Sequence, residues 1–166
     1  MCAKYSSGFS RGPLQYHFHV RLAPQETRTY FITVVTAQRR SLFQVTRTAE
    51  LLLQTIHHYR AQGKFLLHAF VIMPDHFHVI LTPASDVSLE KAVQFIKGGF
   101  SFRLKSKTDV WMRSFNESQI SNEENFQSHV RYIEENPVRR GLVKEPRAYP
   151  FSSASHPCDP MPVHFR

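Results

Sequence analysis

The feature that most constrains the fold is an apolar stretch that a proline turn divides near its middle. Residues 64–73 are rich in β-branched, aromatic and other apolar side chains, and His76 to Thr82 continue the same character. Between them stands Met73-Pro74-Asp75, a sequence typical of a tight turn. The two runs are each short, as buried strands are. The chain is therefore predicted to contain two neighbouring strands of a β-sheet.

Two helices and two more strands are expected around these strands. Thr29 to Thr36 is rich in β-branched and aromatic residues and predicts a strand. Val45 to Gln62 and Ser88 to Lys105 carry apolar residues at helical spacing, although Gly98-Gly99 is an unfavourable pair inside the second helix. Val110 to Phe115 is predicted as the fourth strand. The order strand, helix, strand, strand, helix, strand is typical of a ferredoxin-like α+β fold, a βαββαβ antiparallel sheet with helices on one face.

An extra C-terminal helix follows this series, and the two ends of the chain have a different character. Asn122 to Glu135 predicts a helix that Pro137 stops. We expect an N-terminal arm over residues 1–28, in which Leu14 to Leu22 could form a short strand. One domain is expected over residues 29–145, and a proline-rich extended tail over residues 146–166.

The charge balance points to a polyanionic partner. Lys and Arg total 21 and Asp and Glu total 13, so the formal net charge is 21 − 13 = +8, with a pI near 9.8. Cationic side chains gain free energy by displacing counterions from phosphates, although a basic protein without such a partner is the alternative. The two cysteines, Cys2 and Cys158, form no metal or disulfide motif, and no signal peptide or membrane span is recognised. A cytoplasmic protein is expected.

Two histidines at the start of the strand from residue 76 are candidate metal ligands. Because the side-chain period of a strand is two, His76 and His78 share one face while Phe77 and Val79 point to the core. Two adjacent imidazoles can bind one divalent cation. Solvent-facing histidines are the alternative, and the N-terminal His17-Phe-His19 repeats the spacing, so the motif alone does not decide between them.

The last helix supplies two more candidate residues. Its core stripe is Phe126, Val130 and Ile133. Tyr132 is presented on a flank of this stripe, with Asn136 one turn beyond it. A packing tyrosine followed by a helix-capping asparagine is the alternative interpretation.

Taken together, these stretches resemble the REP-associated tyrosine transposases, within the single-tyrosine HUH transposases. The resemblance runs from about Tyr30 to Ser153, and its most specific parts are the His-Phe-His motif after Met73-Pro74 and the Tyr-Ile-x-x-Asn-Pro-Val motif from Tyr132. The other matching stretches are Thr29 to Thr36, Val110 to Phe115, Gly141 to Val143 and Tyr149 to Ser153.

The resemblance implies a mechanism and a substrate. It implies that His76, His78 and Asn136 hold Mg²⁺ or Mn²⁺, and that Tyr132 is a nucleophile that forms a 5′-phosphotyrosine link with single-stranded DNA. It also implies repetitive palindromic hairpins as substrate, and leaves open whether the protein is a monomer or a homodimer. The chain departs from the family over Asn116 to Gln119, where similar sequences often carry Asp-His or Glu-His. Glu117 is a candidate to support the site there.

Basic residues are expected to contact the DNA, with a solvated helix face as the alternative. Arg139 and Arg140 are the first candidates because they adjoin Asn136. The other candidates lie in or near the second helix and the predicted fourth strand: Lys97, Arg103, Lys105 and Arg113.

Other classes of function remain. A non-catalytic nucleic-acid-binding module on the same sheet would bind without metal and without need of Tyr132. A histidine-triad hydrolase needs a third alternating histidine, but position 80 is Ile. A rolling-circle replication nickase shares the chemistry, but we recognise no helicase domain.

Overall fold

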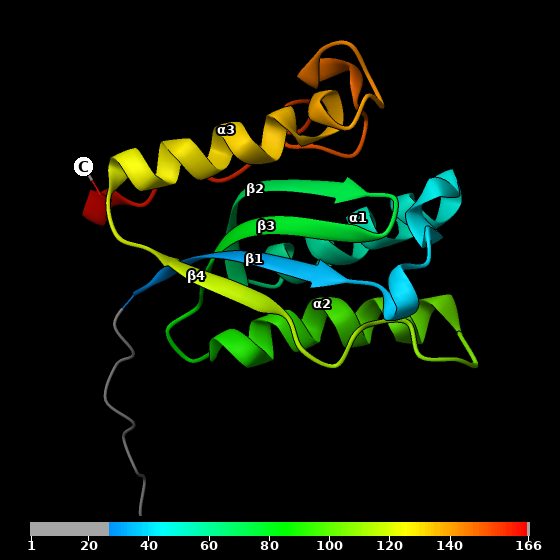
Figure 1. The fold of residues 1–166 in the computed structure, drawn as a ribbon. Helices are drawn as coiled ribbons and strands as arrows, with labels where there is room; N and C mark the ends of the chain where they lie inside the picture. The colour runs from blue at the N-terminus through cyan, green and yellow to red at the C-terminus, as the bar shows by residue number, and fades with distance from the viewer. Residues whose placement is uncertain (1–26, 166) are drawn as a thin grey trace, which may run out of the picture.

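A four-stranded antiparallel sheet forms the centre of the computed structural model, which describes residues 27–165 (Figure 1). The strands are β1 (Thr29–Val35), β2 (Phe65–Met73), β3 (His76–Pro83) and β4 (Asn116–Ile120). The helices are α1 (Thr46–Ala61), α2 (Leu89–Leu104) and α3 (Glu123–Arg139). The strand suggested over Leu14 to Leu22 and the His17-Phe-His19 motif lie outside the described residues.

The order of the strands across the sheet is β2-β3-β1-β4, and β3 pairs antiparallel with both β1 and β2. Helices α1 and α2 cover one face, and α3 crosses the other (Figure 1). The chain forms two β-α-β units, β1-α1-β2 and β3-α2-β4. Strand β3 lies between the two strands of the first unit, and β1 lies between the two strands of the second. This arrangement confirms the predicted ferredoxin-like fold with an extra C-terminal helix.

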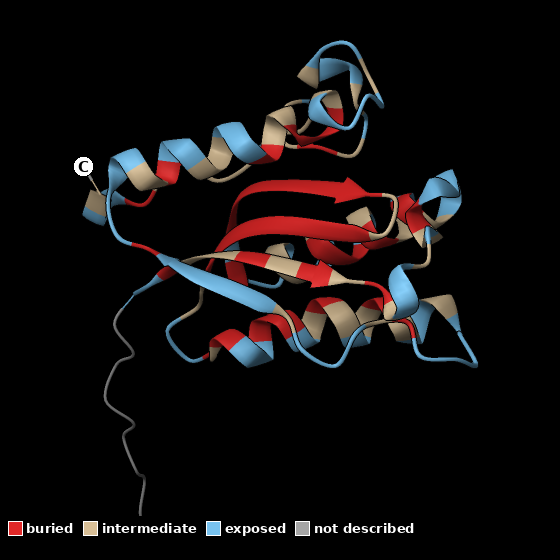
Figure 2. Cartoon of the chain, in the orientation of Figure 1, coloured by how far each residue is buried: buried red, intermediate tan, exposed pale blue. Residues whose placement is uncertain are grey.

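Because both faces of the sheet are covered, the alternation along β3 fills two separate cores. Phe77, Val79 and Leu81 belong to the core against α1 and α2, whereas Ile80 belongs to a smaller core beneath α3. The strands β2 and β3 are buried along nearly their whole length (Figure 2). The histidines at alternate positions of β3 therefore face α3 and are buried rather than exposed to solvent.

The fourth strand lies later in the chain than predicted. Within the predicted range, Val110 to Phe115, Trp111 forms only an isolated bridge with Thr36. Its indole ring instead packs against Phe77, with ring centroids 5.5 Å apart, so the apolar residues here serve the core. The real strand, β4, has the polar sequence Asn-Glu-Ser-Gln-Ile, which an edge strand tolerates because one side faces water.

Helix α3 also differs from its prediction, since it continues through Pro137 to Arg139. A proline inside a helix removes one backbone hydrogen bond and is usually costly. Here Pro137 is buried in the last turn, and its carbonyl accepts a hydrogen bond from the N–H of Leu142 at 2.9 Å. The packing and the C-terminal hydrogen bonds allow the helix to end at Arg139, four residues beyond the predicted end at Glu135.

The C-terminal residues run along the outer edge of β2. The N–H of Ile72 donates to the carbonyl of Phe151 at 2.9 Å, and the N–H of Ser153 donates to the carbonyl of Phe70 at 2.8 Å. Further along, both carboxylate oxygens of Asp159 pair with the guanidinium of Arg60. The edge of β2 is therefore covered, and short 3-10 turns at Pro146–Ala148 and Val163–Phe165 interrupt the tail. None of the helices in residues 27–165 is long and apolar enough to cross a membrane.

The adjacent glycines of α2 are predicted to respond differently to substitution. A Cβ added at Gly99 would lie 2.5 Å from Cε2 of Tyr59, whereas one added at Gly98 would have no neighbour within 4 Å. Gly99→Ala should lower the free energy of unfolding by about 1–3 kcal/mol through overpacking. Gly98→Ala should raise it by up to about 1 kcal/mol through helix propensity. Urea unfolding of both variants tests this, and equal effects at the two positions would contradict the packing described.

Candidate active site

The two histidines of β3 form the centre of the candidate site. His76 is the first residue of the strand after the Pro74-Asp75 turn, and His78 follows on the same face. The centroids of the two imidazole rings are 4.8 Å apart. His76 is 7% exposed and His78 is 5% exposed, so the residues lie beneath α3 rather than in open solvent.

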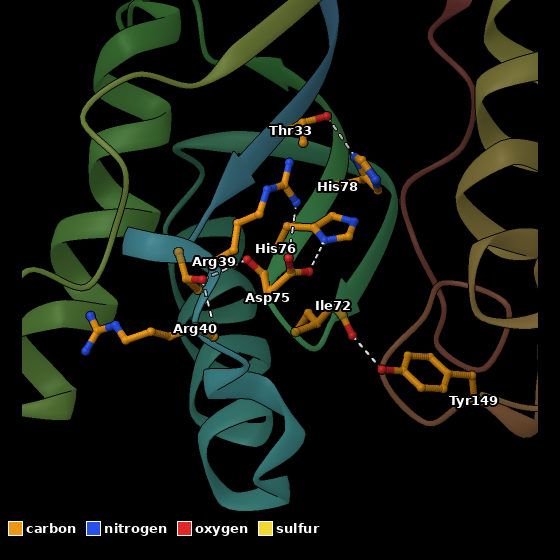
Figure 3. Close-up of polar contacts among 9 residues, drawn as sticks. Thr33, Arg39, Arg40, Ile72, Asp75, His76, His78 and Tyr149 are labelled. Carbon is orange, nitrogen blue, oxygen red and sulfur yellow. Dashed lines mark hydrogen bonds and ion pairs between the residues drawn. The ribbon is translucent and has the colours of Figure 1, made fainter. Parts of the chain in front are cut away.

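The ring of His78 is held in one orientation with one nitrogen left over. Its Nδ1 lies 2.8 Å from Oγ1 of Thr33, the residue directly opposite on β1 (Figure 3). Its Nε2 is buried and has no hydrogen-bond partner among the described residues. Burial first, and then the charges of His76 and Arg140, lower the pKa of His78 to about 3. At neutral pH the ring is therefore uncharged. In the tautomer in which Nδ1–H donates to Thr33, Nε2 carries a free lone pair.

His76 is held in a comparable way from the turn that precedes it. Its Nδ1 lies 2.6 Å from Oδ1 of Asp75, and the other carboxylate oxygen accepts a hydrogen bond from Arg39 at 3.2 Å (Figure 3). Burial raises the pKa of Asp75, but the hydrogen bonds from His76 and Arg39 outweigh it, and the net shift is downward. The carboxylate therefore stays charged and accepts from Nδ1–H, which leaves Nε2 of His76 available as well.

Tyr132 of α3 lies beside the imidazole pair. Its ring centroid is 5.5 Å from that of His78 and 5.9 Å from that of Phe31. Phe31 also stacks on His78 at 5.3 Å and contacts His129 at 4.7 Å, so one β1 side chain joins the strand histidine to the helix. Tyr132 keeps 39% of its surface exposed, which makes the phenol accessible to a ligand.

Asn136 completes the set of potential ligands. It is 6% exposed and therefore belongs to the buried side of α3. One helical turn separates Asn136 from Tyr132 and another separates it from Arg140. The Tyr132 ring contacts the His78 ring, and the charge of Arg140 helps to lower the pKa of His78. Asn136 therefore lies in the buried turn of α3 between two residues that interact with His78.

The side chains are of the kinds that can ligate a divalent cation. Over residues 27–165 no cluster of three or more His, Cys, Asp or Glu side chains could hold a metal ion, and the candidate ligands here are two imidazoles and one amide. Two imidazoles and one amide oxygen can ligate one divalent cation when water and phosphate fill the remaining positions. The unpaired, buried Nε2 of His78 is the observation that favours an absent ligand, because such atoms are rarely left without a partner.

The predicted DNA contacts divide into two groups. Arg139 lies with its guanidinium carbon 5.7 Å from the Tyr132 ring centroid and pairs with Glu135 at 2.7 Å, and Arg140 is close enough to affect His78. Arg113 is next to Met112, whose N–H donates to the carbonyl of Val35. Val35 pairs with His76, so the backbone of Arg113 lies near the same end of the sheet as His76.

The second group lies on α2, on the opposite face of the sheet (Figure 1). Lys97 donates to the carbonyl of Met112 at 2.9 Å, and burial lowers its pKa. Arg103 donates to Thr55 of α1, and Lys105 caps the end of α2. The structure therefore does not bring these three cations together with Tyr132.

The register of β4 tests the suggestion about Glu117. Glu117 pairs with Ile32, whose side chain belongs to the core against α1 and α2. It therefore points to the face away from His78 and cannot support the site, which corrects the expectation from sequence. Ser118 pairs with Phe31 and shares the face of the site.

Four residues with evident roles in this arrangement were not singled out from the sequence. They are Phe31, Thr33, Asp75 and His129. The alternation of β1 could have placed Phe31 and Thr33 on one face, but only the register between β1 and β3 shows that Thr33 meets His78. The contact of His129 with Phe31 depends on how α3 crosses the sheet, which no local pattern contains.

Comparison with known proteins agrees with this geometry. Residues 25–136 match the family described as "Transposase IS200 like". The chain is 33% identical over 126 residues to the REP-associated tyrosine transposase of Escherichia coli (strain K12), which covers 75% of each chain. It is also similar to the solved structure of a REP-associated tyrosine transposase bound to a REP hairpin, with a TM-score of 0.70, 30% identity, and coverage of 84% of this chain and 87% of that one.

An enzyme class follows from the fold and these matches together: the chain belongs to the IS200-like transposase family. Within that family its relatives are the REP-associated tyrosine transposases, which confirms the resemblance inferred from the sequence motifs.

The protonation state of His78 can be measured directly. With a pKa of about 3, its ring signals should not move between pH 8 and pH 5, and its ¹⁵N shifts should report the Nδ1–H tautomer. Thr33→Val should produce a mixture of tautomers because the acceptor is lost, whereas Thr33→Ser should not. An imidazole that titrates near 6.5 in the wild-type protein, assigned to His78, would contradict the burial described.

Proposed function

We propose that the protein is a metal-dependent DNA strand transferase that breaks and rejoins single-stranded DNA, with Tyr132 as nucleophile. The observation that carries this proposal is the position of the Tyr132 ring, 5.5 Å from the ring of a neutral, buried histidine with an unpaired Nε2. A packing tyrosine would not require this neighbour. The exposed fraction of Tyr132, 39%, leaves room for a phosphodiester to approach it.

His76, His78 and Asn136 would hold the cation, which is Mg²⁺ or Mn²⁺. When bound, the ion would polarise a non-bridging oxygen of the scissile phosphate and offset the charge that develops there. Thr33 and Asp75 each hydrogen-bond the Nδ1 of one imidazole, so the Nε2 of each ring would be the atom that binds the ion.

The reaction exchanges one phosphoester for another. The phenol oxygen of Tyr132 attacks phosphorus, the bond from phosphorus to the 3′-oxygen breaks, and the 3′-oxygen leaves with a proton as a free hydroxyl. The phenol proton is lost to solvent. The product is a 5′-phosphotyrosine, and attack by a 3′-hydroxyl on the same phosphorus reverses these steps and reseals the strand. The energy of the broken bond is retained in the link, so rejoining requires no ATP.

Repetitive palindromic hairpins are the proposed substrate. The support is the similar structure that is bound to a REP hairpin, at 30% identity. Arg139 and Arg140, at the end of α3, would contact phosphates next to the reacting one. Arg139 is oriented by Glu135 and lies over the Tyr132 ring, so its charge stands beside the proposed nucleophile.

A covalent-adduct experiment tests the proposal. The protein is incubated with an end-labelled single-stranded hairpin and Mn²⁺, and adducts that resist denaturant are counted by gel electrophoresis. We expect an adduct with the wild-type protein, none with Tyr132→Phe, and a loss of at least 100-fold with His76→Ala. His76→Ala should retain most of the salt-dependent DNA affinity, because phosphate contacts by cations supply that term.

Tyr149→Phe is the matched control. Its phenol oxygen donates to the carbonyl of Ile72 at 2.7 Å, away from the histidine pair (Figure 3). This variant should form the adduct and lose only about 1 kcal/mol of stability. An adduct that persists in Tyr132→Phe would assign the nucleophile to another residue, and binding without any adduct would favour the non-catalytic module.

A further inference from the structure

Helices α1 and α2 lie on the face of the sheet opposite α3 (Figure 1). A groove follows the seam between these two helices. Two hollows of about 580 and 590 Å³ form it, and they share Gln54 and Arg103 as a common wall. Neither hollow includes a residue of the candidate active site. The groove therefore needs an explanation of its own.

The floor of the groove contains a glycine that the packing of the protein does not require. Gly99 is needed because the Tyr59 ring occupies the space where its Cβ would be. Gly98 has open space around it, although a glycine inside a helix is less favourable than an alanine. Its missing side chain leaves the backbone of α2 accessible from the groove.

An aromatic ring stands at the edge of this floor. Phe102 lines the groove. It is 85% exposed, the highest value among the large hydrophobic residues of the described part of the chain. It belongs to neither hydrophobic core. A ring in this position offers a flat face on which another flat, apolar group can stack.

The charges along the groove favour an anionic ligand. Arg103 is held by Oγ1 of Thr55 at 2.9 Å and by Oε1 of Gln54 at 3.1 Å, and because these partners are neutral its charge is not cancelled by them. Arg47 lines the same groove, and Lys105 is exposed just beyond its end. Glu50 is the single carboxylate among the lining residues.

This combination distinguishes between possible occupants. A second copy of the chain, related by a two-fold axis through the groove, would place Arg47 and Arg103 against the same cations, and each chain already carries a net charge of +8. A ligand with anionic groups and flat unpaired rings satisfies both the arginines and Phe102. Single-stranded nucleic acid has both features.

We infer that the groove between α1 and α2 binds a segment of single-stranded DNA, with one base stacked on Phe102 above Gly98 and a phosphate beside Arg103. The inference rests on the proposed function only in taking DNA as the polyanion. Because the groove and Tyr132 lie on opposite faces of the sheet, this segment is distant along the strand from the phosphodiester that reacts. The second site would hold the strand while its ends are exchanged.

Photocrosslinking locates the bound base. Single-stranded oligonucleotides that carry 5-iodouracil at successive positions are irradiated with the full-length protein, and the adducts are mapped after trypsin digestion. We expect an adduct on the tryptic peptide Gly98–Arg103, which contains Phe102. Phe102→Leu should abolish that adduct and raise the Kd for the oligonucleotide about five-fold or more.

Two further variants test whether a change in the Kd for the oligonucleotide comes from the groove itself. Gly98→Leu fills the floor and should raise the Kd to a similar extent, with urea unfolding used to confirm that the variant folds. Leu66→Ala changes another exposed apolar side chain, at 51% exposure, and should leave the Kd unchanged.

The proposal is overturned if crosslinks map only to β3 and α3 while Phe102→Leu retains the wild-type Kd. It is also overturned if sedimentation shows a dimer that Phe102→Leu dissociates, because the face is then an interface between copies. Tyr132→Phe should keep the Gly98–Arg103 crosslink, so that failure of the covalent chemistry and failure of the groove are separate results.

Discussion

The site depends on the two-residue period of β3 inside a sheet that is covered on both faces. Phe77 and Val79 point into the core against α1 and α2, and this packing fixes which way the strand faces. His76 and His78 are then required to point toward α3. A shift of one residue in the pairing would move the histidines into the larger core and place Phe77 beneath α3. The hydrophobic core therefore determines the direction of the candidate ligands.

The hydrogen bonds of Thr33 and Asp75 add orientation to that direction. Each takes up the Nδ1 of one histidine and leaves the Nε2 of both rings for another partner. Such arrangements are general in metal sites, where the groups behind the ligands set the tautomer and the angle of the ring. Phe31 lies on β1, as Thr33 does, and its ring contacts Tyr132 and His129 of α3. Strand β1 therefore positions both a candidate ligand and the proposed nucleophile.

Much of this architecture was predictable from local sequence, and the parts that were not depend on tertiary packing. The hairpin from residue 64, the helices near residues 46–61 and 89–104, and the shared face of His76 and His78 all follow from periodicity and turn residues. The fourth strand was misplaced because the apolar run around Trp111 fills the core, while polar Asn116–Ile120 pairs at the edge of the sheet. The pairing of Thr33 with His78 depends on the register between β1 and β3. The position of the α2 cations, on the face of the sheet opposite α3, depends on how the helices are layered on the sheet.

The central claim is that β3 and α3 contribute to one metal site, and pulsed electron paramagnetic resonance of the Mn²⁺-loaded protein tests it most directly. The account predicts couplings to two imidazole nitrogens, one of which disappears in His76→Gln and the other in His78→Gln. Asn136→Ala should keep both couplings but weaken Mn²⁺ binding about 10-fold or more. Mn²⁺ that binds without imidazole coupling, or with an affinity unchanged by the loss of Asn136, would contradict the account.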